Sequence, residues 1–208
     1  MSNIWFTSDT HFGHKNIVKG ISDWADKSTC RDFTTIEDHD AYIIDIINKM
    51  VKPTDTLYHL GDFGLGFKWK ERLSEVRRLI KCETIHLLVG NHDHVIEEAN
   101  SAAFPNDLQK SIKECFASIK YLSFRKLCKR LIANCHYAML TWPWQHQGSI
   151  QLHGHSHGNL LDDPHALRLD VGFDTCLYGH KKYTLYSIEE IFHIIDNHKK
   201  FVPVDHHM

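Results

Sequence analysis

The chain has 208 residues, of which 42% are hydrophobic and 24% are charged, and its length is typical of one domain, here expected to span residues 1–208. A formal net charge of −2 gives no general reason to expect a surface that coats a long polyanion, so any nucleic-acid contact is expected to be local. The six cysteines include no CxxC pair, which predicts free thiols in a reducing compartment. The sequence has no long apolar run and no leader pattern, so we expect no membrane contact and a cytoplasmic location.

Strand-then-helix units fill the first half of the chain. Short apolar runs predict strands, apolar positions at helical spacing predict helices, and the polar stretch 20–33 reads as an irregular excursion. The expected strands are 4–7, 55–60 and 84–89, and the expected helices are 35–50, which Pro53 stops, and 69–79. Such an alternation indicates a partly parallel sheet with outer helices and with its site at the carboxyl ends of the strands.

The second half of the chain contains short strands close in sequence, which favours antiparallel pairing in a second sheet packed on the first. The expected strands are 121–124, 131–135, 149–152, 167–171 and 183–186. A closing helix at 187–198 carries a capping signature, Ser187 followed by Glu190, and is expected to cover one outer face. The predicted fold class is therefore α/β, with two packed mixed β-sheets flanked by helices.

Five polar motifs follow the predicted strands, and their carboxylate, imidazole and amide groups are donors for divalent metals. The motifs are Asp9-Thr10-His11, Gly61-Asp62, Gly90-Asn91-His92-Asp93, His136 and Gly154-His155-Ser156-His157. A carboxylate between two dications can bridge them, and Asp62, after a glycine, is the best candidate. One metal would take Asp9, His11, Asp62 and His157. The other would take Asp62, Asn91, His136 and His155.

This mixed donor set differs from the thiolates of structural zinc and from the oxygen-only sites of magnesium, so we expect two ions, with Mn²⁺ favoured and Fe, Zn, Ni or Co as alternatives. Two such ions would ionise a water between them for attack on a phosphoester. His92 follows the ligand Asn91 and is expected to protonate the leaving group. Asp93 is expected to orient the His92 imidazole.

The order of these motifs resembles the calcineurin-like metallophosphoesterase superfamily, whose pattern is DxH, GD, GNHD or GNHE, an isolated His and GHxH. The opening at residues 6–14 and the stretch 60–63 are similar to a small branch found in bacteria and their phages. The resemblance covers nearly the whole chain and implies a four-layer sandwich, a dinuclear centre and the ligand roles given above. Two departures are Tyr137-Ala138, where relatives often carry a proline, and the Asp170–Asp174 segment, which has Asp in place of the family's Asn and is expected to be a strand end.

The expected activity is that of a phosphodiesterase acting on a small, nucleotide-like phosphoester. A phosphomonoesterase or a nuclease with the same centre is the alternative, and a non-catalytic interaction module that shares the fold is a further one. The native substrate and the oligomeric state are left open, because specificity lies in loops without a shared code.

Four residues outside the motifs are candidate substrate contacts. His14 and Lys15 follow the first motif and could meet phosphate oxygens, although a solvated loop fits Lys15 equally well. Trp142 and Trp144 could form a wall on which a nucleobase stacks, although a loop folded on its own apolar residues is the favoured reading. The basic pairs at 125–126, 129–130 and 181–182 are expected to be solvated turns, so extended nucleic acid is not an expected partner.

Overall fold

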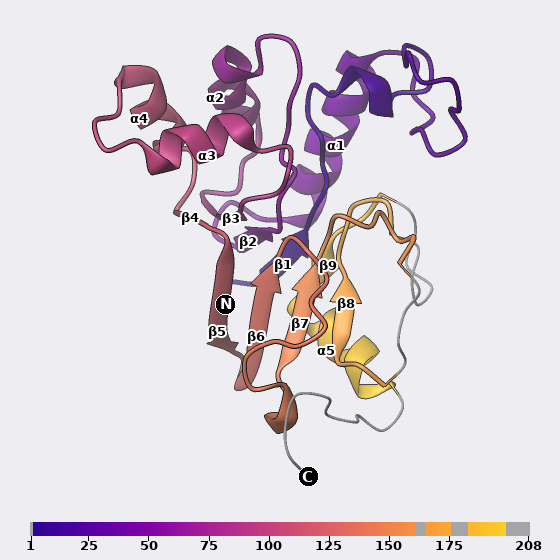
Figure 1. Cartoon of the computed structure of the whole chain (residues 1–208), viewed down its shortest axis with the longest axis vertical. Helices are drawn as coiled ribbons and strands as arrows, with labels where there is room; N and C mark the ends of the chain where they lie inside the picture. The colour runs from indigo at the N-terminus through magenta and orange to yellow at the C-terminus, as the bar shows by residue number, and fades with distance from the viewer. Residues whose placement is uncertain (1, 161–164, 176–182, 199–208) are drawn as a thin grey trace.

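The computed structural model describes residues 2–160, 165–175 and 183–198. In these residues the chain forms two mixed β-sheets accompanied by helices, which confirms the predicted fold class (Figure 1). The first sheet has the strand order β4-β3-β2-β1-β9, and the second has the order β5-β6-β7-β8. The basic pair 181–182 lies outside the described residues, and the single-domain assignment stays a prediction.

Three predicted strands form the centre of the first sheet. They are β1 (Ile4–Thr7), β2 (Thr56–His59) and β3 (Thr84–Leu88), which pair in parallel. At the edges lie β4 (Ser118–Lys120), which is parallel to β3, and β9 (Tyr186–Ser187), which is antiparallel to β1. Because side chains alternate along a strand, Leu57 and Ile85 face the outer helices while Phe6 and Tyr58 face the second sheet.

Four helices cover the outer face of the first sheet (Figure 1). They are α1 (Ile36–Met50), α2 (Trp69–Leu79), α3 (His94–Ser101) and α4 (Asp107–Glu114). The structure confirms α1, whose cap Thr35 accepts a hydrogen bond from the Asp38 amide, and α2. The sequence analysis did not predict α3 and α4, which are short. Buried side chains such as Ile47, Leu73 and Ile96 join these helices in one core cluster.

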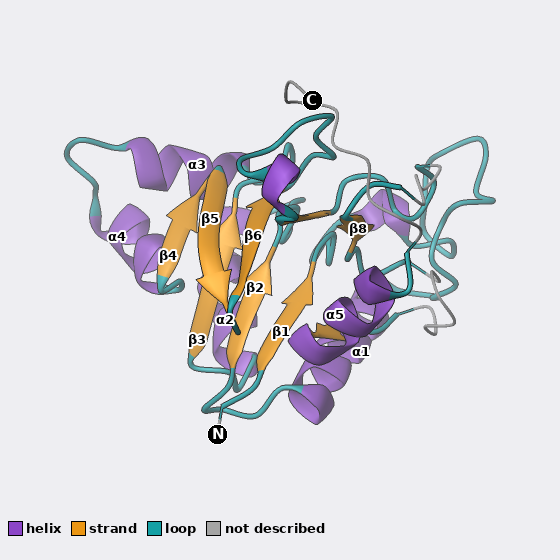
Figure 2. Cartoon of the chain, turned by 90° about the horizontal axis from the view of Figure 1, so that it is seen from below, coloured by secondary structure: helices purple, strands orange, loops and turns teal. Residues whose placement is uncertain are grey.

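The second sheet corrects the expectation of antiparallel pairing. Its strands are β5 (Leu122–Leu127), β6 (Arg130–Cys135), β7 (Ile150–His153) and β8 (Arg168–Asp170). Only β5 and β6, which a tight turn joins, pair in antiparallel fashion, as their opposed arrows show in Figure 2; β6–β7 and β7–β8 are parallel. The connections 136–149 and 154–167 are long enough to return the chain to the starting edge. As a result β6 and β7 end at the same edge of the sheet.

The closing helix α5 (Ile188–Asp196) has the predicted capping box of Ser187 and Glu190. Its expected place on an outer face was wrong, because its apolar residues belong to the core between the two sheets. There Ile191 and Ile195 pack in one cluster with residues of β1 and β7. The outer face of the second sheet is instead covered by the loop that contains the 3₁₀ turn Gln145–Gln147, where Trp142 packs with Ala133.

Candidate metal centre

The five polar motifs meet at one edge of the molecule. Asp9, Asp62 and Asn91 follow the carboxyl ends of β1, β2 and β3, and His136 and His155 follow those of β6 and β7. Because each sheet is parallel through these strands, their ends open on the same side, and the core between the sheets places the two edges next to each other.

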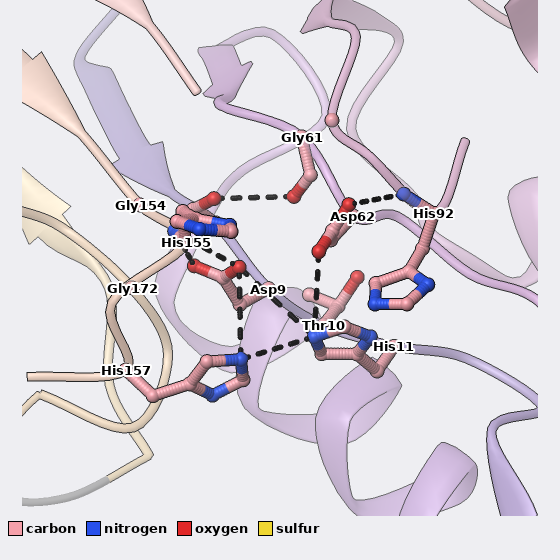
Figure 3. A network of polar contacts seen from close by, with 12 residues as sticks. Asp9, Thr10, His11, Gly61, Asp62, His92, Gly154, His155, His157 and Gly172 are labelled. Carbon is pink, nitrogen blue, oxygen red and sulfur yellow. Dashed lines mark hydrogen bonds and ion pairs between the residues drawn. The ribbon is translucent and has the colours of Figure 1, made fainter. Parts of the chain in front are cut away.

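The first donor group consists of Asp9, His11 and His157. The Nε2 atoms of the two imidazoles are 3.2 Å apart, and Oδ1 of Asp9 lies 4.0 Å from Nε2 of His11 and 3.9 Å from Nε2 of His157. Figure 3 shows the three side chains converging on one point. Asp9 and His11 are buried, so the group offers nitrogen and oxygen donors that are shielded from water.

The second donor group consists of Asp62, His136 and His155, with Asn91 between the two histidines. Oδ1 of Asn91 lies 3.1 Å from Nε2 of His136 and 2.9 Å from Nδ1 of His155. Nδ1 of His136 faces the Leu60 carbonyl at 2.7 Å, which leaves Nε2 for the site. All the residues predicted as ligands therefore belong to one of these two groups.

The Asp62 carboxylate lies between the groups. Its Oδ2 atom is 3.7 Å from Nε2 of His11 and 3.5 Å from Nε2 of His136, while Oδ1 accepts a hydrogen bond from the His92 amide at 2.8 Å (Figure 3). One oxygen is thus fixed by the backbone, and the other is directed at both groups.

Several of these residues have left-handed backbone conformations, which cost about 1–3 kcal/mol each for residues other than glycine. The φ angle is 58° for Asp9, 52° for His11 and 55° for Asp62. Glycines allow the turns to come together: a Cβ on Gly154 would meet Oδ2 of Asp9 at 2.5 Å. Such strain persists where the surrounding contacts fix it, and it clusters at functional sites.

The electrostatics of the two groups suit a cation. Burial lowers the pKa of His11 well below its usual value, so its imidazole is neutral, as a ligand must be. Burial alone would lower the pKa of His136, but contact with Asp62 and the charges of Asp9 and Asp62 raise it to about 9. The two carboxylates therefore stabilise a positive charge on the His136 imidazole, and a bound metal ion would take the place of that proton. The residues present therefore fit a metal centre.

His92 lies beside the first donor group, where its ring centroid is 5.4 Å from that of His11 and 5.9 Å from that of His14. His14 also contacts Trp24, and burial lowers its pKa to about 4, so it is neutral near pH 7. The structure therefore brings His14 next to the candidate proton donor. Lys15 is half exposed, and its ammonium forms an ion pair with Asp23 at 2.8 Å.

Asp93 does not have the contacts expected of a residue that orients His92. Its two carboxylate oxygens accept hydrogen bonds from the backbone amides of Asp62, Phe63 and Gly90, at 2.8 to 2.9 Å. Burial raises its pKa to about 7 despite these bonds. Asp93 thus joins the loop after β2 to the loop after β3, and we correct its predicted role to that of a residue that positions Asp62.

The tryptophan wall, the less favoured of the two readings of Trp142 and Trp144, does not form at Trp142, which instead packs within its own loop and against the second sheet. Trp142 is 3% exposed, its Nε1 donates to the Ser149 carbonyl, and it packs in the cluster on the outer face of the second sheet. It therefore has no face free for a nucleobase. Trp144 is 47% exposed and stacks on Phe124 of β5.

Two residues that the sequence analysis missed hold the first donor group. Arg31, from the polar excursion, is 1% exposed and donates to the carbonyls of Asp9 and Thr10 and to both carboxylate oxygens of Asp174. Asp174 in turn lies 2.6 Å from Nδ1 of His157. Burial would raise the pKa of Asp174, but Arg31 and His157 hold it well below its usual value. No local spacing links these residues, so the sequence carried no signal for them.

Comparison with known proteins agrees with this geometry. A family model described as calcineurin-like phosphoesterase matches residues 2–191. The chain belongs to this family. As a calcineurin-like phosphoesterase it has the expected motifs, and its family membership supports a phosphoester hydrolase that uses divalent metal ions.

Relatives of this calcineurin-like phosphoesterase occur in phages and archaea. The gene 66 protein of Mycobacterium phage L5 is 26% identical over 214 residues, which cover 95% of this chain and 96% of that protein. An uncharacterized protein of Methanocaldococcus jannaschii is 27% identical over 163 residues, which cover 78% of this chain and 74% of that protein. A solved protein of unknown function from Aquifex aeolicus is similar, with a TM-score of 0.57 and 22% sequence identity. The match covers 93% of this chain and 100% of that protein, and it supports the fold alone.

In the part of the chain that the structure describes, no helix has the length and apolar character needed to cross a membrane. The cytoplasmic location stays a prediction.

Proposed function

We propose that this calcineurin-like phosphoesterase is a dinuclear-metal phosphodiesterase that hydrolyses a small, nucleotide-like phosphoester. The observation that carries the proposal is the place of the Asp62 carboxylate, with Oδ2 3.7 Å from His11 and 3.5 Å from His136. A carboxylate between two donor groups is the arrangement that a pair of dications requires, because its charge offsets part of their repulsion.

We assign one ion to Asp9, His11, Asp62 and His157, and the other to Asp62, Asn91, His136 and His155. When bound, two divalent ions would activate a water and neutralise phosphate charge. The mixed nitrogen and oxygen donors favour Mn²⁺, with Fe, Zn, Ni and Co as alternatives.

His92 is the proposed proton donor to the leaving group. Its amide is bonded to Oδ1 of Asp62, and its ring lies against His11, so the imidazole faces the space next to the first donor group. A neutral leaving alcohol forms when His92 gives its proton to the oxygen of the breaking P–O bond.

The charges around the site favour a diester over a monoester. A monoester dianion gains from additional fixed cations around its oxygens. In the first motif loop, Lys15 is neutralised by Asp23, and His14 is neutral near pH 7 because burial lowers its pKa to about 4. Arg31 is buried and paired with Asp174. His14 and Arg31 therefore offer no free positive charge to a second phosphate oxygen, and Lys15 offers one only by leaving its exposed pair with Asp23, so a singly charged diester fits better.

The test is hydrolysis of bis(p-nitrophenyl) phosphate and p-nitrophenyl phosphate after metal removal and readdition of Mn²⁺, Zn²⁺, Ni²⁺ or Co²⁺. We expect higher kcat/KM for the diester, and its loss in Asp62→Asn but not in the surface variant Asp45→Asn, whose carboxylate pairs with Lys49 at the helix surface. A higher kcat/KM for the monoester would identify a phosphomonoesterase. Hydrolysis of neither compound with any metal would support the non-catalytic interaction module.

A further inference from the structure

A cavity of about 430 Å³ lies beside His92 on the side of the outer helices. It is lined by residues 65–66 and 68 of the loop before α2, by residues 69–71 in the first turn of α2, and by His92, His94 and Val95 at the start of α3. We refer to it as the α2–α3 cavity. Its volume falls in the range of small-molecule sites. Because His92 belongs to its lining, the cavity is adjacent to the candidate metal centre.

The lining of the α2–α3 cavity is rich in groups that bind anions. The lining includes two lysines, Lys68 and Lys70, together with His94, against one acidic residue, Glu71. Lys70 is 3.2 Å from the exposed Glu98, an ion pair that a phosphate could displace at small cost. The lining therefore favours an anionic ligand.

Both helices that border the cavity begin at it. The residues before them, Lys68 and Asp93, make no side-chain hydrogen bond to the first helical turn, so the positive ends of the two helix dipoles are not capped by a side chain. This adds to the attraction that the lysines exert on an anion.

The loop that carries Lys68 is held in a strained and tightly packed conformation. Lys68 has a φ of 56°, which is unfavourable for a residue with a side chain. Gly66 has a φ of 119°, and a Cβ there would meet the Gly13 carbonyl at 2.3 Å, so the loop packs against the first motif loop. The neighbouring Phe67 is 85% exposed. The Lys68 ammonium lies over this ring, with its nitrogen 5.3 Å from the ring centroid.

We propose that the α2–α3 cavity binds the leaving-group side of the substrate, and that this leaving group carries a second phosphate. The proposal rests on the proposed function, in which water attacks phosphorus, the P–O bond to the leaving group breaks, and His92 protonates the departing oxygen. Because His92 lines the cavity, the group that receives its proton must lie at the cavity entrance. Leu65 and Val95 supply apolar surface for a sugar or base, and Lys68 and Lys70 bind the second phosphate. The substrate class is a short oligonucleotide with at least two phosphates.

The experiment compares the dithymidylate TpT with pTpT and TpTp, which carry one further phosphate at either end. We expect kcat/KM for one of the two to exceed that for TpT by about tenfold, the gain of one charge-assisted contact of about 1.4 kcal/mol. In Lys68→Gln/Lys70→Gln this ratio should fall to about one. The matched control is Lys110→Gln/Lys113→Gln on α4, which should keep the wild-type ratio.

A second readout needs no catalysis. Thymidine 3′,5′-bisphosphate is titrated calorimetrically into metal-free protein, and we expect about tenfold weaker binding in Lys68→Gln/Lys70→Gln than in the α4 control. Equal kcat/KM for the three nucleotides in the wild type, or a ratio that the lysine changes do not alter, would overturn the proposal. If no diester is hydrolysed with any metal but bisphosphate binding still depends on the two lysines, the cavity assignment holds and the proposed function fails.

Discussion

Asp174→Asn tests whether the residues behind His157 control metal binding. The change removes the charge that faces Nδ1 of His157 at 2.6 Å and Nη2 of Arg31 at 2.7 Å. Loss of a partner behind a metal-binding histidine typically weakens metal affinity by about 10- to 100-fold, or about 1.4 to 2.7 kcal/mol. The loss should fall on the ion held by Asp9, His11 and His157, because Asp174 contacts the His157 imidazole of that group.

The same change leaves Arg31 without its counter-charge. Arg31 is 1% exposed, so the range of about 3–5 kcal/mol for breaking a buried ion pair applies. We expect the lower end, about 3 kcal/mol, because Arg31 still donates to the carbonyls of Asp9 and Thr10. For a chain of this size the Tm should fall by about 6–12 °C.

Mn²⁺ titration of metal-depleted protein by calorimetry measures the affinities, and differential scanning calorimetry measures the Tm. We expect one weakened site and one site within about twofold of the wild type. Asp45→Asn, an exposed i,i+4 partner of Lys49, is the matched control. Wild-type affinities at both sites together with an unchanged Tm would refute the reasoning, and an equal loss at both sites would mean that Asp174 acts on the fold instead.

Five further substitutions test other parts of the structure. Asp62→Asn should lower the content of both ions measured by mass spectrometry, because a neutral amide bridges dications poorly; two retained ions with full turnover would exclude the bridge. His92→Ala should keep both ions but lose on the order of a hundredfold in kcat for an alkoxide leaving group and less for nitrophenolate. Equal losses would show that His92 positions the phosphate. Trp142→Ala should lower the unfolding free energy by about 3–5 kcal/mol in denaturant titration, whereas Trp144→Ala should cost about 1 kcal/mol or less; reversed values would contradict the packing. Burial lowers the pKa of His59 to about 3 in the folded state, against about 6.5 in the unfolded chain. The unfolded chain therefore binds a proton at His59 more readily, so the stability that this neutral imidazole allows is full above pH 6.5 and falls as the pH drops from there toward 3. His59→Gln should flatten this loss in metal-free protein between pH 7 and 5, and an unchanged slope would assign it to other groups.

Local signals explain why much of the fold could be predicted. The helix Trp69–Leu79 and the capping box of Ser187 and Glu190 depend on residues within one or two turns, and the structure has both as predicted. The motif residues were found for a related reason. Each follows a strand directly, so the position of the strand end also fixes the position of the ligand candidate.

Long-range choices explain what could not be predicted. The sequence of a strand does not determine whether it pairs in parallel or antiparallel fashion with its neighbour. We expected β7 to be antiparallel to β6, but the long connection 136–149 returns the chain to the starting edge and the two strands are parallel. The sequence of a loop does not show which of its tryptophans is buried, and in the structure Trp142 is buried whereas Trp144 is exposed. Asp93 stands next to His92 in sequence, but its oxygens bind backbone amides of the loop after β2. Adjacency in the sequence suggested a contact between the Asp93 carboxylate and the His92 imidazole, but the carboxylate is used by backbone amides instead.

The polar excursion at 20–33 shows how such a long-range contact supports the site. Asp9 and His11 adopt strained left-handed conformations that need fixed partners on both sides. On one side, the Asp9 and His11 amides donate to the carbonyls of Gly61 and Asp62. On the other, Arg31 donates to the Asp9 carbonyl and, through Asp174, reaches His157. The polar excursion therefore helps to hold the first donor group in place, and the geometry of that group depends on five segments that are distant in sequence, at residues 9–11, 31, 61–62, 157 and 174.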